Sequence, residues 1–284
     1  MRRIVHVEID STYFERFGLA FFKSFYHHNK GWDLFVADLG LTPEQRVLLE
    51  PYGEVRSYKR DDSSRWAQLS ARIASWVDVV KDDNIVLHMD VDAVVLDNYD
   101  AEVEDFVRGG YDLAGCDWDL KLTYSARNVE GVKKALGLAP DSNVMTEGRR
   151  IHAGWLLMRG SVDMHAALQW FKGHWRDYSP HTTEEETGLS SLVFARGLKF
   201  QALKIVDCPA MSHIPDYAYM IPSAEPVSRY FAGRSRFIHF AQCKFFFFYT
   251  SAGDSREHFM AWEDALLRPY AELPWPDPES VRDR

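Results

Sequence analysis

The chain has 284 residues, of which 46% are hydrophobic and 26% charged, a balance that excludes a disordered chain, a coiled coil and a disulfide-stapled miniprotein. Its 42 acidic residues outnumber its 33 basic ones and give a formal charge of −9, which argues against a nucleic-acid partner. The three cysteines, Cys116, Cys208 and Cys243, are widely spaced and form no CxxC pair. We therefore expect neither a disulfide framework nor a thiolate zinc site, and we expect a cytoplasmic protein.

The N-terminal segment, Met1–Glu8, enters an alternating apolar and polar pattern at once and lacks the apolar stretch of a signal peptide. No apolar run approaches the length of a membrane span. We therefore expect no leader and no transmembrane segment.

The first half of the chain alternates short β-rich runs with longer helical patterns. This order is typical of βαβ units, so it predicts an α/β domain with a mainly parallel central sheet and helices on both faces. The predicted strands are Arg3–Ile9, Trp32–Ala37, Glu54–Tyr58, Asn84–Met89 and Tyr111–Cys116. The predicted helices are Tyr13–His28, Pro43–Glu50, Ser64–Val80 and Ala101–Arg108.

The second half is less regular and begins with a polar insertion, Lys121–Arg150, of the kind that often forms a lid or a substrate loop. We see no linker and no second core, so we expect one domain over residues 1–273 and a loose surface tail over residues 274–284. The predicted strands here are Ile151–Arg159, Arg236–Phe240 and Lys244–Thr250, and the predicted helices are Asp163–Asp177, Glu184–Ala195 and Ser255–Leu267.

The sharpest motif is a pair of carboxylates, Asp90 and Asp92, which directly follow the apolar strand Asn84–Met89. Strand side chains alternate between faces, so both aspartates point the same way while Val91 turns into the core. Two hard oxygen ligands suit Mg²⁺ or Mn²⁺. A solvated acidic turn is the alternative, since short DxD strings are common. The apolar run Ala93–Leu96 favours the metal, because paired carboxylates inside apolar sequence repel one another unless a cation neutralises them.

With this motif after a central strand, the chain resembles the GT-A glycosyltransferases, most closely glycosyltransferase family 8 and related nucleotide-diphospho-sugar transferases. The resemblance spans about Ile4 to Leu267. It implies a single Rossmann-like GT-A domain with a nucleotide-binding half at about residues 1–120 and an acceptor-binding half at about residues 121–273. It also implies that Asp90 and Asp92 hold Mn²⁺ or Mg²⁺ against the diphosphate of a UDP-sugar.

The resemblance implies roles for three residues of the first half. Asp10 and Tyr13, in the loop after the first strand, take the place of the groups that hold the nucleotide base and ribose. An acid at this place is equally suited to cap the following helix. Arg72 takes the place of a basic residue that reaches the donor phosphates, although helical arginines are more often solvated or paired on a surface.

Further candidates lie beside the expected donor sugar. His152, in His152-Ala153-Gly154, stands where the family has asparagine, and a buried structural histidine is the alternative. Asp117, after the strand Tyr111–Cys116, is placed to bind sugar hydroxyls, or it is an ordinary turn acid. Glu185 and Glu186 fall near the anomeric carbon in the family, where a carboxylate steadies positive charge or orients the acceptor. Acids after threonine in a first helical turn are also a routine cap.

The last matching segment is Arg236–Lys244. In the family its histidine is the third protein ligand of the metal, here His239, and its lysine reaches phosphate, here Lys244. The resemblance thus implies retaining, metal-dependent transfer of a sugar to an acceptor hydroxyl of a glycan or glycoconjugate. Two alternatives are a phosphotransferase of the haloacid dehalogenase type, which also places DxD after an apolar strand, and a catalytically silent GT-A glycan-binding protein.

Overall fold

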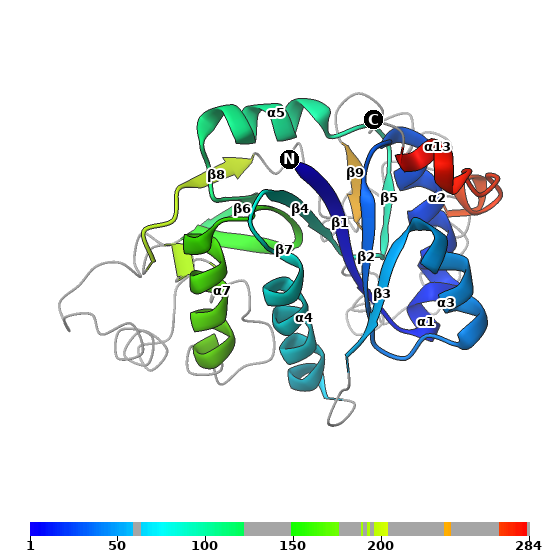
Figure 1. Ribbon diagram of the computed structural model, residues 1–284, viewed down its shortest axis with the longest axis horizontal. Helices are drawn as coiled ribbons and strands as arrows, with labels where there is room; N and C mark the ends of the chain where they lie inside the picture. The colour runs from blue at the N-terminus through cyan, green and yellow to red at the C-terminus, as the bar shows by residue number, and fades with distance from the viewer. Residues whose placement is uncertain are drawn as a thin grey trace, which may run out of the picture.

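The computed structural model describes residues 1–58, 64–121, 149–175, 189, 192–193, 196–203, 236–239 and 267–282. Within these ranges seven strands form a central sheet in the order β3-β2-β1-β4-β7-β6-β8, and β5 pairs with β9 in a small second sheet (Figure 1). The bounds of the strands are β1 Arg2–Ile9, β2 Asp33–Asp38, β3 Gly53–Ser57, β4 Asn84–Met89, β5 Ala93–Val95, β6 Leu113–Lys121, β7 Arg149–Arg159, β8 Phe200–Leu203 and β9 Phe237–His239.

The helices alternate with the strands as the sequence predicts. The start of α3 shows how local sequence sets the first residue of a helix. Thr42 Oγ1 accepts a hydrogen bond from the backbone N–H of Gln45, whose side chain accepts one from the N–H of Thr42, and Pro43 occupies the first turn. The bounds are α1 Ser11–Tyr13, α2 Leu19–His28, α3 Pro43–Leu49, α4 Arg65–Val79, α5 Asp100–Gly109, α7 Val162–His174 and α13 Pro278–Arg282, with single turns η1 Phe14–Gly18 and η2 Glu50–Tyr52.

The helix predicted over Tyr13–His28 differs in its first turns. It begins at Ser11, because the side chain of Asp10 caps it by accepting a hydrogen bond from the N–H of Tyr13 at 3.0 Å. Residues Phe14–Gly18 then form a π-helical turn before α2 continues. A π-turn adds a residue to one helical turn, which neither apolar periodicity nor propensity reveals.

Strand direction decides where polar side chains meet. Strands β3, β2, β1 and β4 are parallel, so their carboxyl ends share one edge of the sheet. Strand β7 runs antiparallel to β4, with Met89 opposite Trp155, and β6 runs antiparallel to β7. Residues in the middle of β7 therefore lie beside the last residues of β4, and the N–H of Asp90 donates to the carbonyl of Gly154 at 3.0 Å.

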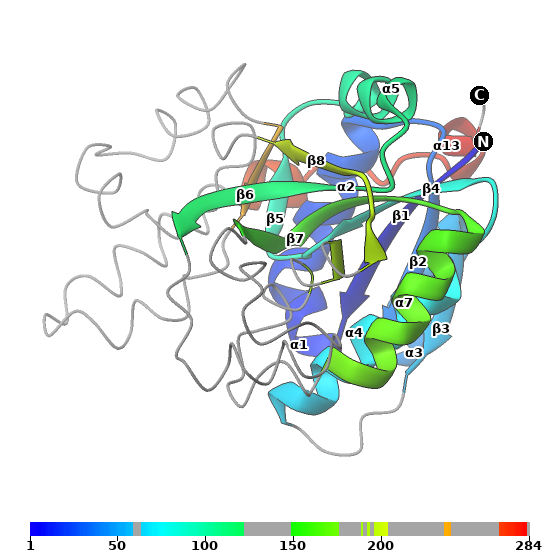
Figure 2. The same cartoon turned by 90° about the vertical axis from the view of Figure 1, so that its left-hand side faces the viewer.

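Two apolar layers cover the sheet, and alternation along β1 and β4 assigns residues to each. Val5, Val7 and Ile9 of β1 pack with residues of α2 and α5. Ile4 of β1 and Val86 of β4 pack with residues of α4 and α7 on the other face, where these two helices lie side by side (Figures 1 and 2). The mainly parallel α/β sheet with helices on both faces is thus confirmed.

The C-terminal segment corrects the expectation of a loose tail. The ring of Trp275 lies 5.6 Å from that of Tyr52, whose hydroxyl donates to the carbonyl of Pro276 at 2.6 Å. Val281 in α13 is 1% exposed, and its carbonyl accepts from the N–H of Gly31 at 2.6 Å. The richness of this segment in Pro and Asp suggested solvation, but its apolar residues are what anchor it to the core.

The structure also tests the expectations for the later strands and helices. Strand β6 continues to Lys121, so Asp117 lies inside a strand, opposite Ile151, and not after its end. The predicted strands Ile151–Arg159 and Arg236–Phe240 and the helix Asp163–Asp177 are present with shifted ends. Residues 122–148 of the insertion Lys121–Arg150, the strand Lys244–Thr250 and most of the helices Glu184–Ala195 and Ser255–Leu267 lie outside the described residues.

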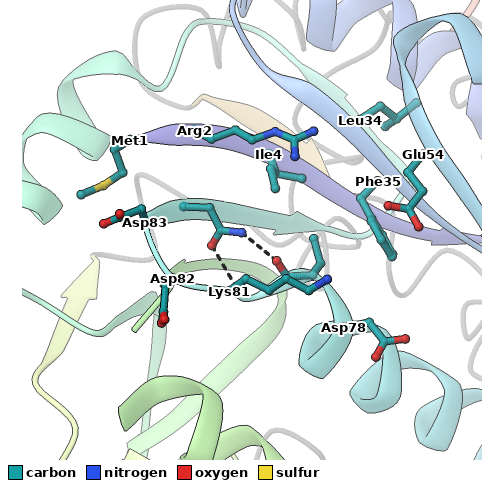
Figure 3. A pocket seen from close by; sticks show the side chains of 12 residues that line it. Met1, Arg2, Ile4, Leu34, Phe35, Glu54, Asp78, Lys81, Asp82 and Asp83 are labelled. Carbon is teal, nitrogen blue, oxygen red and sulfur yellow. Dashed lines mark hydrogen bonds between the residues drawn. The ribbon is translucent and has the colours of Figure 1, made fainter. Parts of the chain in front are cut away.

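A cavity of about 700 Å³ opens at the opposite, amino edge of the sheet (Figure 3). Ile4, Leu34 and Phe35 contribute apolar walls, and Asp82 and Asp83 stand at its rim. The side chain of Asn84 forms hydrogen bonds with the turn before β4: it donates to the carbonyl of Val79 and accepts from the N–H of Lys81. Among the described residues no helix combines the length and apolarity that a bilayer crossing needs.

Candidate metal centre

The two aspartates stand where β4 ends and β5 begins. Val91, between them, is buried in the core beside α2, which turns both carboxylates to the same side. Asp92 is buried and Asp90 keeps 21% side-chain exposure. The common direction predicted from the strand pattern is confirmed, because both carboxylates reach one imidazole: His239 Nε2 lies 3.1 Å from Asp92 Oδ1 and 3.4 Å from Asp90 Oδ2.

His239 reaches this place through the second sheet. Strand β9 pairs antiparallel with β5 and sets His239 opposite Ala93, next to Asp92. The pairing is extended by the N–H of Leu96, which donates to the carbonyl of Arg236 at 2.7 Å. The guanidinium of Arg236 also forms ion pairs with Glu102 of α5, at 2.8 Å, and with Asp97. Two backbone strands and an ion-paired arginine thus hold the histidine against the two carboxylates.

The protonation of His239 and Asp90 follows from their contacts. Burial alone would lower the pKa of His239, but Asp92 and Asp90 outweigh it and raise that pKa to about 9. Burial alone would raise the pKa of Asp90, yet the charge of Arg72 and the hydrogen bond from His239 hold it well below its usual range. Near neutral pH His239 is therefore an imidazolium and Asp90 a carboxylate.

Gly154 makes the site compact. Its N–H donates to His152 Nδ1 at 3.1 Å, so a neutral His152 carries its proton on Nε2. The ring of His152 lies edge-on to that of His239, with 5.0 Å between centroids. A Cβ on Gly154 would stand 2.6 Å from His152, 2.7 Å from His239 and 2.9 Å from Asp90 Oδ2. Only glycine leaves room for these three side chains to converge.

Arg72 of α4 contacts the aspartate from the other side. One of its terminal nitrogens lies 2.7 Å from Asp90 Oδ1, and its Nε donates to Glu8 Oε1 at 2.7 Å. Glu8 is not among the site residues predicted from the sequence. A signal for it was present, because Ile4, His6 and Glu8 alternate with three apolar residues along β1 and thus share the face that α4 covers.

Two buried histidines stand behind this ion pair, and their tautomers can be derived. Ser75 Oγ donates its only proton to the carbonyl of Arg72 at 2.7 Å, so His6 Nε2 must donate to Ser75 Oγ, 2.8 Å away. His6 Nδ1 then accepts from His88 Nδ1 at 2.8 Å. Burial and then the charge of Arg72 lower the pKa of His88 to about 3, so this pair is neutral.

No protein-family model matches the chain, and no curated protein matches it. Solved structures do. The glycosyltransferase GlyE of Streptococcus pneumoniae TIGR4 is similar with a TM-score of 0.51 and 17% identity, over 95% of this chain and 62% of GlyE. The bifunctional glycosyltransferase WbbM gives a TM-score of 0.50 and 14% identity, over 92% of this chain and 49% of WbbM. This chain has the GT-A fold. It spans less than two thirds of either protein.

The GT-A fold gives the predicted residues a common frame. The structure brings Asp90, Asp92, His239, His152 and Arg72 together at the junction of β4, β7 and β9. Asp10 and Tyr13 lie on the turn after β1, at the same carboxyl edge, with Asp10 in the capping role that was its alternative. Glu185, Glu186 and Lys244 lie outside the described residues, so their roles stay predictions, as does membership of family 8.

The residues present fit a divalent metal ion. One ligand atom each from Asp90, Asp92 and His239 lies within 4.8 Å of the others. Two carboxylate oxygens and one imidazole nitrogen suit Mn²⁺ and leave further positions for water or phosphate oxygens. His239 must lose its extra proton to become a ligand, and a divalent cation between the carboxylates replaces the charge of that proton.

Proposed function

We propose that this chain is a metal-dependent glycosyltransferase that moves a sugar from a nucleotide diphosphate, UDP in the first instance, to an acceptor hydroxyl of a glycan or glycoconjugate. The observation that carries the proposal is the convergence of Asp90, Asp92 and His239 at the carboxyl edge of a GT-A sheet. Ligands of open α/β sheets bind at that edge. The similarity to glycosyltransferases of known structure supports the proposal and gives no support to the haloacid dehalogenase alternative.

In this mechanism Asp90, Asp92 and His239 would hold the ion. An ion held there would supply positive charge against the departing diphosphate. The guanidinium of Arg72 is already paired with Glu8 and Asp90. In this structure its positive charge therefore acts on the Asp90 carboxylate. We propose that Lys244 adds a further positive charge at the phosphates.

The remaining residues position the two substrates. We propose that Asp10 and Tyr13 hold the nucleoside and that His152, with its proton on Nε2, donates to the donor sugar, with Asp117 as a further sugar contact. A neutral His152 in this tautomer has no free nitrogen to take up a proton, because Nδ1 accepts from Gly154. Glu185 or Glu186 is assigned to the anomeric carbon, with retention of configuration, and the cysteine pattern supports a cytoplasmic setting.

The test is an isothermal calorimetric titration of the protein with UDP in the presence and in the absence of Mn²⁺. We expect UDP to bind only with the metal, and Asp92→Asn to abolish this binding. Asp105→Asn is the matched control, because Asp105 is an exposed acid of α5 paired only with Arg108 among the contacts described here. UDP binding that is equal without Mn²⁺, or unchanged in Asp92→Asn, overturns the proposal.

A panel of nucleotide sugars, read by mass spectrometry, then identifies the donor. NMR of the product assigns the anomeric configuration, and inversion would overturn the retaining assignment. Metal-dependent UDP binding with no release of UDP from any donor would indicate the silent glycan-binding alternative.

A further inference from the structure

Strands β1 and β4 carry the same sequence of side-chain chemistry in register. Ile4 pairs with Val86, and His6 pairs with His88. Two residues after each histidine stands a carboxylate, Glu8 inside β1 and Asp90 directly after β4. All of these side chains point to the α4 face of the sheet. The two strands therefore form a ladder in which an apolar pair is followed by an imidazole pair and then by a carboxylate pair.

Arg72 fills the last step of this ladder. Its guanidinium donates from Nε to Glu8 at 2.7 Å, and a terminal nitrogen lies 2.5 Å from the same Glu8 oxygen and 2.7 Å from Asp90 Oδ1. The side chains of Arg72 and Glu8 are 4% and 3% exposed. Burial this deep makes the pair costly to separate, since a single charge left behind would have no water to solvate it.

The two oxygens of Asp90 are divided by these contacts. Oδ1 is taken by Arg72, whereas Oδ2 faces His239 and the Cα of Gly154. Asp90 thus presents one oxygen to the centre of the site. The three carboxylates Glu8, Asp90 and Asp92 against the one guanidinium leave two negative charges when His239 is neutral, which is the charge that a divalent cation balances.

We propose that Glu8 is a positioning residue of the metal centre: it holds Arg72 in place, so that the arginine fixes Oδ1 of Asp90 and leaves Oδ2 for the ion. This inference rests on the proposed function. Without the Glu8 carboxylate, Asp90 is the acid that the described residues place against the buried guanidinium, and the forked geometry of arginine favours engaging both oxygens of one carboxylate. Arg72 then competes with the ion for Oδ2.

The first experiment measures the dissociation constant of Mn²⁺ alone by calorimetry and by electron paramagnetic resonance. We expect Glu8→Gln to weaken Mn²⁺ binding by roughly 10- to 100-fold, the range found when groups that orient metal ligands are removed. The matched control is Asp38→Asn. Asp38 is the last residue of the neighbouring strand β2. It is likewise a buried acid in an ion pair with an arginine, but its partner is Arg46. We expect this control to lose stability and to bind Mn²⁺ as the wild type does.

A second variant separates positioning from general damage. In Glu8→Gln/Arg72→Met no buried arginine is left to compete, so we expect Mn²⁺ binding to recover most of what Glu8→Gln loses. This double variant also avoids an unpaired buried charge, so it serves if Glu8→Gln fails to fold, with Glu8→Asp as the charged comparison. A merely structural role for Glu8 predicts no recovery.

The outcomes are distinct. Wild-type protein that binds no Mn²⁺ overturns the proposed function and this inference with it. Wild-type binding that persists in Glu8→Gln, or a double variant that binds no better than the single one, overturns the role of Glu8 alone and leaves the metal centre standing.

Discussion

Replacing Gly154 by alanine tests the packing of the metal centre with a single methyl group. The φ of Gly154 is not positive, so alanine meets no backbone penalty there and the whole effect is steric. The new Cβ would lie 2.6 Å from His152 and 2.7 Å from His239, so these rings must move by about 0.8 and about 0.7 Å to reach an ordinary contact of 3.4 Å. Asp90 Oδ2, at 2.9 Å, must move as well.

Two magnitudes follow. Overpacking of this kind costs roughly 1–3 kcal/mol of the free energy of unfolding. Because a metal site tolerates displacements of only about 0.5 Å, we expect Mn²⁺ affinity to fall by at least roughly tenfold. The assays are urea unfolding at neutral pH and calorimetric titration with Mn²⁺.

Gly173→Ala is the matched control. Gly173 lies near the end of α7, and a Cβ there meets nothing within 4 Å. We expect it to raise the free energy of unfolding by about 0.5–1 kcal/mol, as alanine does over glycine in a helix, and to leave Mn²⁺ binding unchanged. A Gly154→Ala protein with the urea midpoint and Mn²⁺ affinity of the wild type would refute the convergence of His152, His239 and Asp90 around this glycine.

Two further predictions concern stability. Without metal, the free energy of unfolding should fall as pH rises from about 6.5 to about 9, because the folded chain keeps a proton on His239 that the unfolded chain has already lost. Urea midpoints measured in the presence of a chelator report this fall. A fall of equal size in His239→Gln would contradict the assignment of the proton to His239. Val281→Ala should cost roughly 1–3 kcal/mol, because Val281 is 1% exposed in the docked C-terminal segment. Val162→Ala, at a residue 72% exposed, should stay within about 0.5 kcal/mol of the wild type.

The bounds of β4 were predictable because Asn84 and Asp90 delimit a run that is apolar except for His88 and that the fold buries completely. The extension of β6 through Asp117 was not, since its pairing with β7 is a tertiary contact that overrides a polar local sequence. The docking of Trp275 was not predicted, because composition was the only guide to this segment. Two prolines and an acid around Trp275 indicated a solvated tail, whereas its large apolar ring packs on Tyr52.

The site divides in the same way. The common direction of the Asp90 and Asp92 carboxylates could be predicted from strand alternation and from the apolar runs that flank them. His239 entered only through the family resemblance, because no local pattern links it to residues 147 positions earlier. Glu8 was overlooked because a single acid in a strand carries no ligand signal by itself; its meaning comes from Arg72, on a helix 64 residues away.

The pairing of β5 with β9 has a consequence for the order in which the protein matures. The ribosome makes Asp90 and Asp92 long before His239. A growing chain that ends before β9 therefore contains only two of the three groups. Domains fold as units, and until β9 is present the two carboxylates lack the imidazole that completes the group. In the proposed metal centre, tight capture of an ion therefore requires that β9 has been made and has paired with β5.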